Sequence, residues 1–92
     1  MSGEHTDVVA ELGGTRIEHI LSGVDVRSDL YVQDEDEWVV VIAGSATLEV
    51  DGDRCDLGVG DWALLPAGTP HRVLRTDRGT SWLAVHAPPR TP

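Results

Sequence analysis

The segment from Pro66 to His71 constrains the fold most, because it fixes a tight turn between two strands. Pro66 has no N–H to donate to a neighbouring strand, so the strand before it should end there. Gly68 can adopt positive φ, and Pro70 fixes the exit from the turn. His71 is then expected at the first position of the next strand. An imidazole held by a rigid turn is a candidate metal ligand or base.

The rest of the chain predicts short strands. No stretch of about ten residues or more shows helical spacing, whereas turn signals recur about every eight to twelve residues. Asp51–Gly52 is typical of a two-residue hairpin. Residues 61–65 alternate as a strand in a barrel wall does, with two faces that hold Trp62 with Leu64 and Ala63 with Leu65. The expected fold class is therefore all-β, a barrel or sandwich.

The length of 92 residues indicates one domain with a small core. We expect residues 1–14 to be a flexible polar N-terminal segment, frayed to about Leu12. Residues 15–87 should form the barrel, and residues 88–92 a Pro-rich tail that cannot enter a sheet interior. Residues 24–28 are expected to add a short strand.

Charge and composition exclude several function classes. The chain has a net charge of −9 and no lysine, so nucleic acid and anionic membranes are not expected partners. Cys55 is the only cysteine, which excludes an intramolecular disulfide and a thiolate cluster. The first residues lack the basic and apolar regions of a signal peptide, and a cytoplasmic protein is expected.

The turn segment resembles the second sequence motif of the cupin superfamily. Gly60, Pro66, Gly68 and His71 stand at that motif's spacing without a gap, and Arg75 replaces its closing Asn. The resemblance implies a small jelly-roll β-barrel. It also implies that His71 is one ligand of a divalent ion inside the barrel, as in the metal-binding members, and that the chain forms a homodimer.

The first cupin motif is present in altered form. Glu37 and Gly44 fit its Glu, six residues and Gly. In metal-binding members a pair of histidines, one residue apart, precedes the Glu; here Tyr31 and Gln33 stand in those places. This departure leaves the presence of a metal open.

The position of Glu37 is informative by itself. It borders an apolar strand and shares a face with Val39 and Val41, and a buried carboxylate needs a partner. A metal ion, His71 or a bound ligand could supply one. On one straight strand Gln33 and Glu37 would lie roughly 13 Å apart. A turn at residues 34–36 would let them converge.

His86 is the further imidazole that a sheet could bring to the same cavity. If it points inward, His71, His86 and Glu37 supply two nitrogens and a carboxylate, a set that suits Zn, Fe, Mn or Ni. If it points outward, His71, Glu37 and Gln33 make an oxygen-rich site. Tyr31 could then act as an acid or hydrogen-bond donor.

Three functions follow from these residues. The first is a metal-dependent enzyme that isomerises, oxygenates or eliminates from a small molecule, with Glu37 or Tyr31 moving a proton. The second is a non-catalytic module that binds a small polar or sugar-like ligand. The third is a metal-free structural or regulatory dimer with a filled barrel.

Overall fold

The computed structural model describes residues 3–89, which form eight β-strands and no helix. The strands are β1 (Glu4–Leu12), β2 (Thr15–Ser22), β3 (Glu37–Ala43), β4 (Ala46–Val50), β5 (Asp53–Leu57), β6 (Trp62–Leu65), β7 (His71–Thr76) and β8 (Thr80–His86). No helix of these residues is long and apolar enough to cross a membrane. The predicted all-β fold is confirmed.

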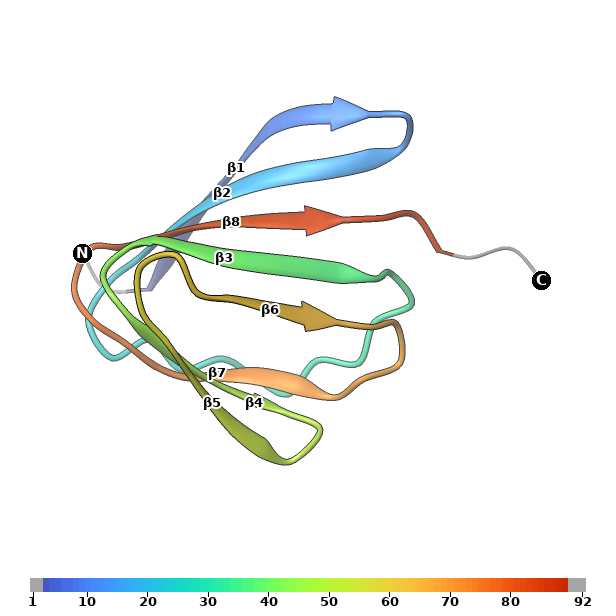
Figure 1. Cartoon of the computed structure of the whole chain (residues 1–92). Coiled ribbons are helices and arrows are strands. Elements are labelled where there is room, and N and C mark those ends of the chain that lie inside the picture. Colours follow the sequence, from blue (N-terminus) through green and yellow to red (C-terminus); the bar gives the residue numbers. More distant parts are fainter. Residues whose placement is uncertain (1–2, 90–92) are drawn as a thin grey trace.

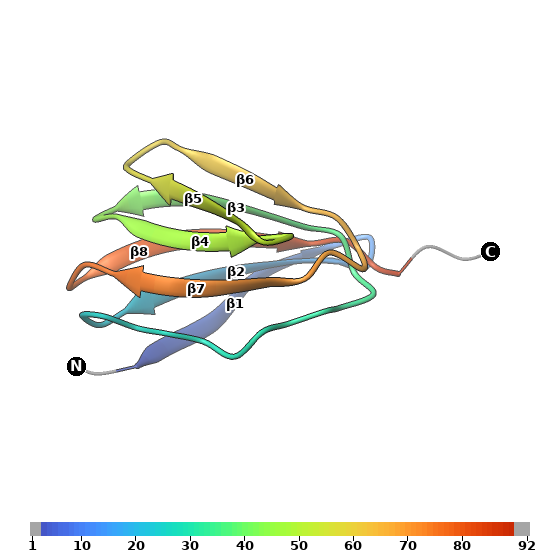
Figure 2. The same cartoon turned by 90° about the horizontal axis from the view of Figure 1, so that it is seen from below.

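Two antiparallel sheets pack face to face (Figures 1 and 2). The larger has the order β1-β2-β8-β3-β6, and the smaller has the order β5-β4-β7. Strands that follow each other in sequence therefore often lie in different sheets, as β6, β7 and β8 do. This crossing between sheets is the jelly-roll arrangement that was expected.

The core lies between the sheets and is made by alternate residues of each strand. On β3, Val39 and Val41 are 4% and 1% exposed. On β6, Ala63 and Leu65 are buried while Trp62 and Leu64 are exposed, which confirms the predicted alternation. Cys55 packs against this core as a free, half-buried thiol.

The predicted hairpin joins β4 to β5. Asp51 and Gly52 have φ angles of 51° and 84°, the left-handed pair that a two-residue turn of this kind requires. Gly44, between β3 and β4, also has a positive φ of 82°. The surroundings of Gly44 are tighter than those of Gly52, because a Cβ added to Gly44 would lie 2.8 Å from the Cα of Thr80.

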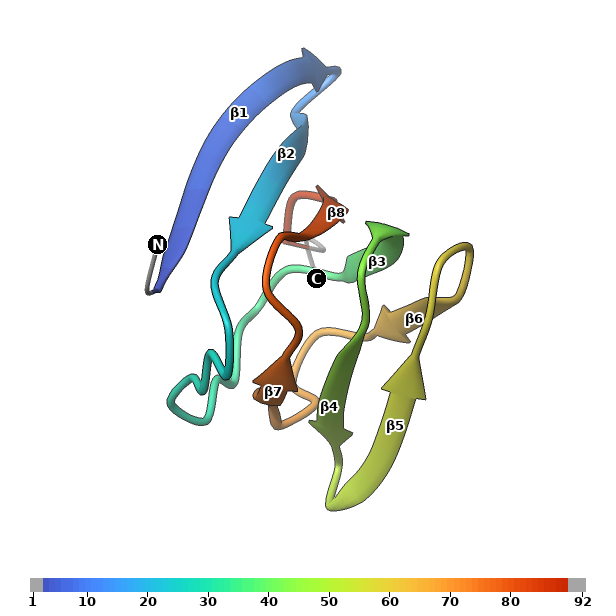
Figure 3. The same cartoon turned by 90° about the vertical axis from the view of Figure 1, so that its left-hand side faces the viewer.

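Residues 24–28 do not form the short strand that we expected. Asp25 has a φ of 54°, and this turn interrupts an extended path. The segment still runs beside β7, since the N–H of Asp25 donates to the Thr76 carbonyl at 2.8 Å and that of Ser28 to Val73 at 3.1 Å. Figure 3 shows this connection passing alongside β7 on its way from β2 to β3. The connection therefore forms part of the barrel wall beside β7.

The expectation of a frayed N-terminal segment is wrong for residues 4–12. They form β1, the edge strand of the larger sheet, paired with β2 from Glu4 opposite Ser22 to Leu12 opposite Thr15. All but Ala10 are exposed, so hydrogen bonds of the ladder hold the strand, and no apolar pattern in the sequence marks it. Residues 1–2 and 90–92, at the ends of the expected leader and tail, lie outside the described residues.

Two glycine variants test these backbone constraints. Gly52→Ala meets no atom within 4 Å, so it should cost only the left-handed backbone penalty, about 1 kcal/mol of unfolding free energy. Gly44→Ala adds a clash with the Thr80 backbone and should cost at least about 2 kcal/mol more. Urea denaturation of both variants measures the difference, and equal losses would contradict the described packing at Gly44.

Candidate active site

A cavity of about 180 Å³ opens between the two sheets. Its apolar wall is formed by Ile20, Val39, Leu48, Leu65, Val73 and Trp82. The predicted site residues Tyr31, Gln33, Glu37, His71 and His86 all line it as well. The barrel is therefore not completely filled, and one end of its interior is polar.

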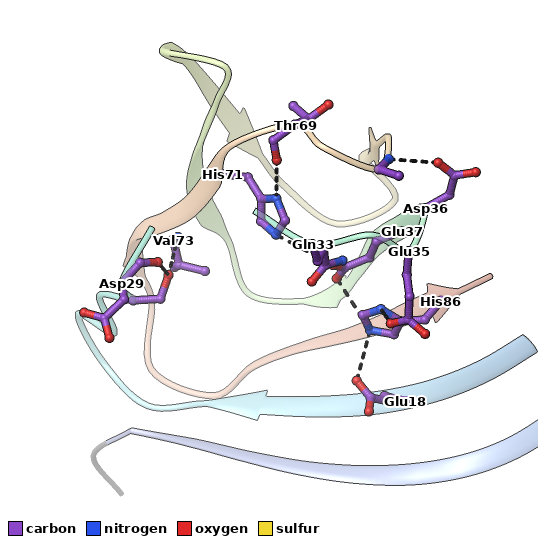
Figure 4. Close-up of polar contacts among 12 residues, drawn as sticks. Glu18, Asp29, Gln33, Glu35, Asp36, Glu37, Thr69, His71, Val73 and His86 are labelled. Carbon is purple, nitrogen blue, oxygen red and sulfur yellow. Dashed lines mark hydrogen bonds and ion pairs between the residues drawn. The ribbon is translucent and has the colours of Figure 1, made fainter. Parts of the chain in front are cut away.

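The carboxylate of Glu37 lies at the centre of this polar end (Figure 4). Its side chain is 11% exposed. Oε1 accepts a hydrogen bond from Gln33 Nε2 at 2.9 Å and lies 3.7 Å from His71 Nε2. Oε2 lies 3.8 Å from His86 Nε2. Glu37 is thus flanked by an imidazole on each side.

Gln33 reaches Glu37 because the chain bends at residues 34–35. This confirms that the acidic run forms a turn and that the two side chains converge. The bend is tied to the neighbouring turn, since the Gly68 N–H donates to the Gln33 carbonyl at 2.8 Å. Asp36 adds a second link by accepting from the Ala67 N–H at 2.8 Å.

The turn before β7 holds His71 as the sequence predicted. Gly68 has a φ of 81°, and the Thr69 N–H donates to the Pro66 carbonyl at 3.0 Å. His71 is 9% exposed. Its ring atom Nδ1 lies 3.1 Å from the Thr69 carbonyl oxygen. A carbonyl oxygen only accepts, so Nδ1 carries the proton. The lone pair of Nε2 in the neutral ring then faces Glu37.

His86 points into the barrel, which settles the orientation that its sequence left open. It follows Trp82 and Ala84 on the buried face of β8, and β3 places Glu37 directly opposite it. His86 Nε2 lies 3.1 Å from Glu18 Oε1, and Nδ1 lies 3.5 Å from Glu35 Oε1. Nδ1 is buried and makes no hydrogen bond within the described residues. Carboxylates therefore surround this imidazole.

Three further residues belong to this cluster and were missed in the sequence. Arg16 Nε donates to Glu18 at 3.0 Å, and Arg16 Nη2 donates to Glu35 at 3.3 Å. The hydrogen bonds that Arg16 donates, first to Glu35 and then to Glu18, raise the pKa of its guanidinium. For Arg16 and Glu18 the available signal was the alternation of β2, whose inner face carries both of them and Ile20. Glu35 lies in the acidic run before β3. The outer face of β2 carries His19, which contacts Ser81 at 2.6 Å.

Tyr31 lies at the rim of the cavity and is 51% exposed. Its backbone pairs with that of His71 through two hydrogen bonds of 2.8 and 2.9 Å. The two rings lie with centroids 6.1 Å apart. Tyr31 is thus close to the polar end of the cavity, and its catalytic role remains a prediction.

The four predicted metal ligands His71, Glu37, Gln33 and His86 are neighbours, but they do not form a metal centre as they stand. Among residues 3–89, no three His, Cys, Asp or Glu side chains are grouped so that they could hold an ion. The contacts give the reason. Gln33 presents its amide nitrogen, which is not a ligand atom, and His86 Nε2 is already engaged by Glu18.

Comparison with known proteins identifies the family. The cupin domain family matches residues 25–86, so the chain belongs to the cupins. A protein from Ralstonia eutropha JMP134, provisionally described as a mannose-6-phosphate isomerase, is 39% identical, and the match covers 91% of this chain and 83% of that chain with a TM-score of 0.83.

Two more distant structures share the fold. KdgF from a Halomonas species is 18% identical over 96% of this chain and 81% of that chain, with a TM-score of 0.88. An RmlC-like cupin from Shewanella frigidimarina NCIMB 400 is 17% identical over 98% and 80%, with a TM-score of 0.86. The expected cupin fold is therefore confirmed.

The hydrogen bond from His71 to Thr69 makes a spectroscopic prediction. Neutral His71 should be the tautomer with a proton on Nδ1, because the Thr69 carbonyl can only accept. Long-range ¹H–¹⁵N correlation spectra at pH 8 distinguish the two tautomers. A proton on Nε2 instead would show that His71 does not direct a lone pair toward Glu37.

Proposed function

We propose that the barrel binds a small molecule and moves a proton on it, with Glu37 and His71 as the reacting groups. The observation that carries this proposal is the largely buried carboxylate of Glu37, which lies between two imidazoles, at 3.7 and 3.8 Å, on the wall of a cavity of about 180 Å³. Two titratable groups side by side can act as base and acid in one step. The cavity also argues against the filled structural barrel.

The geometry supports proton transfer next to a carbonyl group. Glu37 would remove a proton from carbon, while His71, when protonated on Nε2, would give a proton to the carbonyl oxygen. If Glu37 then returns its proton to the former carbonyl carbon and His71 takes a proton from the hydroxyl group on the carbon that Glu37 deprotonated, an isomer forms. If a hydroxyl group on the next carbon leaves instead as water, with the proton held by Glu37, and His71 takes its own proton back, the reaction is an elimination. Gln33 would hold the Glu37 carboxylate in place. Tyr31, at the rim, is a candidate hydrogen-bond donor to the bound molecule.

One relative supports this reaction class. The Ralstonia eutropha protein, 39% identical, is provisionally described as an isomerase. The non-catalytic ligand-binding module is the alternative, and exchange of a substrate proton with solvent separates the two.

Exchange of substrate protons with solvent tests the chemistry directly. We expect wild-type protein in D₂O to incorporate deuterium beside the carbonyl group of at least one compound in a panel of aldoses and ketoses, followed by NMR. Glu37→Gln keeps the shape of the side chain and removes the base, so exchange should slow about 10²–10⁴-fold. Asp53→Asn, an exposed change of the same charge on β5, should have no effect.

If wild type binds a compound from the panel but exchanges no proton, the protein is a binding module. If exchange is equally fast in wild type and Glu37→Gln, Glu37 is not the base.

A divalent metal ion is the second candidate for this site. Two features favour it: His71 Nε2 lies 3.7 Å from Glu37 Oε1, and the carboxylates of Glu18 and Glu37 line the same cavity as His71. The side chains would have to rearrange from the described arrangement, because Glu37 turns its two oxygens to different imidazoles. We therefore assign no reaction step to a metal.

Thermal unfolding of metal-stripped protein with Zn, Fe, Mn, Ni or Co tests the metal site. A resident ion should raise the unfolding temperature of wild type in a concentration-dependent way. His71→Asn should abolish that shift, whereas His5→Asn, an exposed histidine on β1, should keep it. Equal shifts in all three proteins would place the ion elsewhere, and no shift in wild type would remove the metal hypothesis.

We further propose that the chain forms the homodimer expected of it, through the outer face of β3 and β6. This face carries Trp38, Val40, Ile42, Trp62 and Leu64, of which Trp62 is 59% exposed. Trp38 and Trp62 lie with ring centroids 6.2 Å apart. Apolar patches of this kind mark interaction sites. With a net charge of −9, two copies repel least where they meet through an uncharged face.

Sedimentation measurements test the dimer. Wild type should sediment as a dimer, and Trp62→Glu should sediment as a monomer because it places a charge in the contact. Val32→Glu, at an exposed site in the connection between β2 and β3, should leave the dimer intact. A monomeric wild type at tens of micromolar would contradict the proposal.

A further inference from the structure

We propose that the molecule bound in this cavity is uncharged or cationic and rich in hydroxyl or ammonium donors, and that phosphorylated and carboxylated compounds are rejected. This inference rests on the proposed small-molecule site and names its substrate class. It is carried by the charges around the cavity, and it differs from what the description of the Ralstonia eutropha relative would suggest for this chain.

Carboxylates dominate the cavity. Glu4, Glu18 and Glu37 line it directly. Glu35 lies behind His86, with Oε1 3.5 Å from His86 Nδ1. Four carboxylates therefore lie in or next to one small space.

Glu4 is fixed there by a short chain of hydrogen bonds. Trp82 Nε1 donates to Ser22 Oγ at 3.0 Å, and Ser22 Oγ donates to Glu4 Oε2 at 2.9 Å. Trp82 and Ser22 are both buried in the barrel. Glu4 is itself exposed, so these hydrogen bonds hold its charge at the solvent side of the cavity.

The arginines near the cavity do not face a bound molecule. Arg16 is held by Glu18 and Glu35, at 3.0 and 3.3 Å. Among residues 3–89, Arg72 is the only arginine that lines the cavity, and its guanidinium lies 3.0 Å from Glu49. In β7, Arg72 alternates with His71 and Val73, which both face the cavity. Its charge therefore lies on the outer side of the smaller sheet.

Protonation of the imidazoles does not reverse this balance. If His71 and His86 both carried a positive charge, they and Arg16 would supply three cations against the four carboxylates. Arg72 adds nothing to this count, because Glu49 neutralises it. An anionic ligand would therefore enter a cavity of like charge, which disfavours its binding relative to a neutral ligand.

The hydrogen-bonding groups favour the same class of ligand. Carboxylate oxygens only accept hydrogen bonds, and Nε2 of neutral His71 is also an acceptor. Phosphate sites in proteins present donors instead, from arginine, lysine or backbone N–H groups. A molecule that brings several hydroxyl or ammonium donors matches this wall, and its less polar side can rest on the apolar wall that includes Val39 and Leu65.

Matched pairs of ligands test the inference. Wild-type protein labelled with ¹⁵N is titrated at pH 8 and low salt with neutral sugars, their phosphates and their amino-sugar counterparts, for example mannose, mannose 6-phosphate and mannosamine. The indole N–H signal of Trp82, which lies in the cavity wall, reports binding. We expect the neutral or amino member of a binding set to bind at least about tenfold more tightly than the phosphate.

Charge variants locate the cause of this selectivity. Glu18→Gln removes one carboxylate from the cavity and should narrow the preference for the neutral member. Asp53→Asn removes the same charge from the exposed hairpin strand and should leave it unchanged. A second signal, from the Val39 backbone N–H, distinguishes binding in the cavity from a local change at Trp82.

The outcomes separate the two proposals. A phosphate that binds as tightly as its neutral partner, or more tightly, would overturn the inference on ligand charge and leave the small-molecule site standing. If no member of any set perturbs either signal, the proposed function fails and the inference fails with it. Equal selectivity in Glu18→Gln and wild type would show that the cavity carboxylates do not set the preference.

Discussion

The carboxylate of Glu37, held between two imidazoles, is the interaction on which the rest of the site depends. A carboxylate with 11% exposure is stable only if other groups replace its lost hydration. Gln33 replaces part of it with a hydrogen bond of 2.9 Å. His71 Nε2 and His86 Nε2 face the two oxygens of Glu37 at 3.7 and 3.8 Å. The three side chains form one polar cluster on the cavity wall.

Three segments far apart in the sequence must be held together to build this polar cluster. The register of β3 against β8 places Glu37 directly opposite His86. The turn before β7 presents His71, and its Gly68 N–H is bonded to the Gln33 carbonyl. The bend at residues 34–35 is thus fixed both to the turn and, through the Ala87 N–H and the Asp36 carbonyl at 2.9 Å, to the end of β8. Backbone hydrogen bonds, more than side-chain contacts, set the geometry.

The sequence predicted the parts of this arrangement that are local. Pro66, Gly68 and Pro70 define a turn by their own backbone chemistry, so the position of His71 followed directly. The face of Glu37 followed from the apolar residues after it. A bend in the acidic run was also foreseeable, because Gln33 and Glu37 could not meet along a straight strand.

Features that depend on pairing between strands far apart in the sequence could not be predicted from the sequence in this way. Alternation along β2 divides its residues between two faces but does not say which faces inward, so Glu18 and its partner Arg16 were missed. Strand β1 has exposed side chains and is held by its ladder with β2, which leaves no apolar pattern. The same limit applied to His86, whose inward orientation depends on the sheet order around β8.

The most direct test of the account is to compare the imidazole NMR signals of wild type, Glu37→Gln and the exposed control Asp53→Asn at one fixed pH, with ¹³C- and ¹⁵N-labelled histidine. Because His71 and His86 both face the Glu37 carboxylate, Glu37→Gln should shift the ring signals of both, and Asp53→Asn should shift neither. Ring signals of His71 and His86 that are the same in Glu37→Gln and wild type would contradict the account.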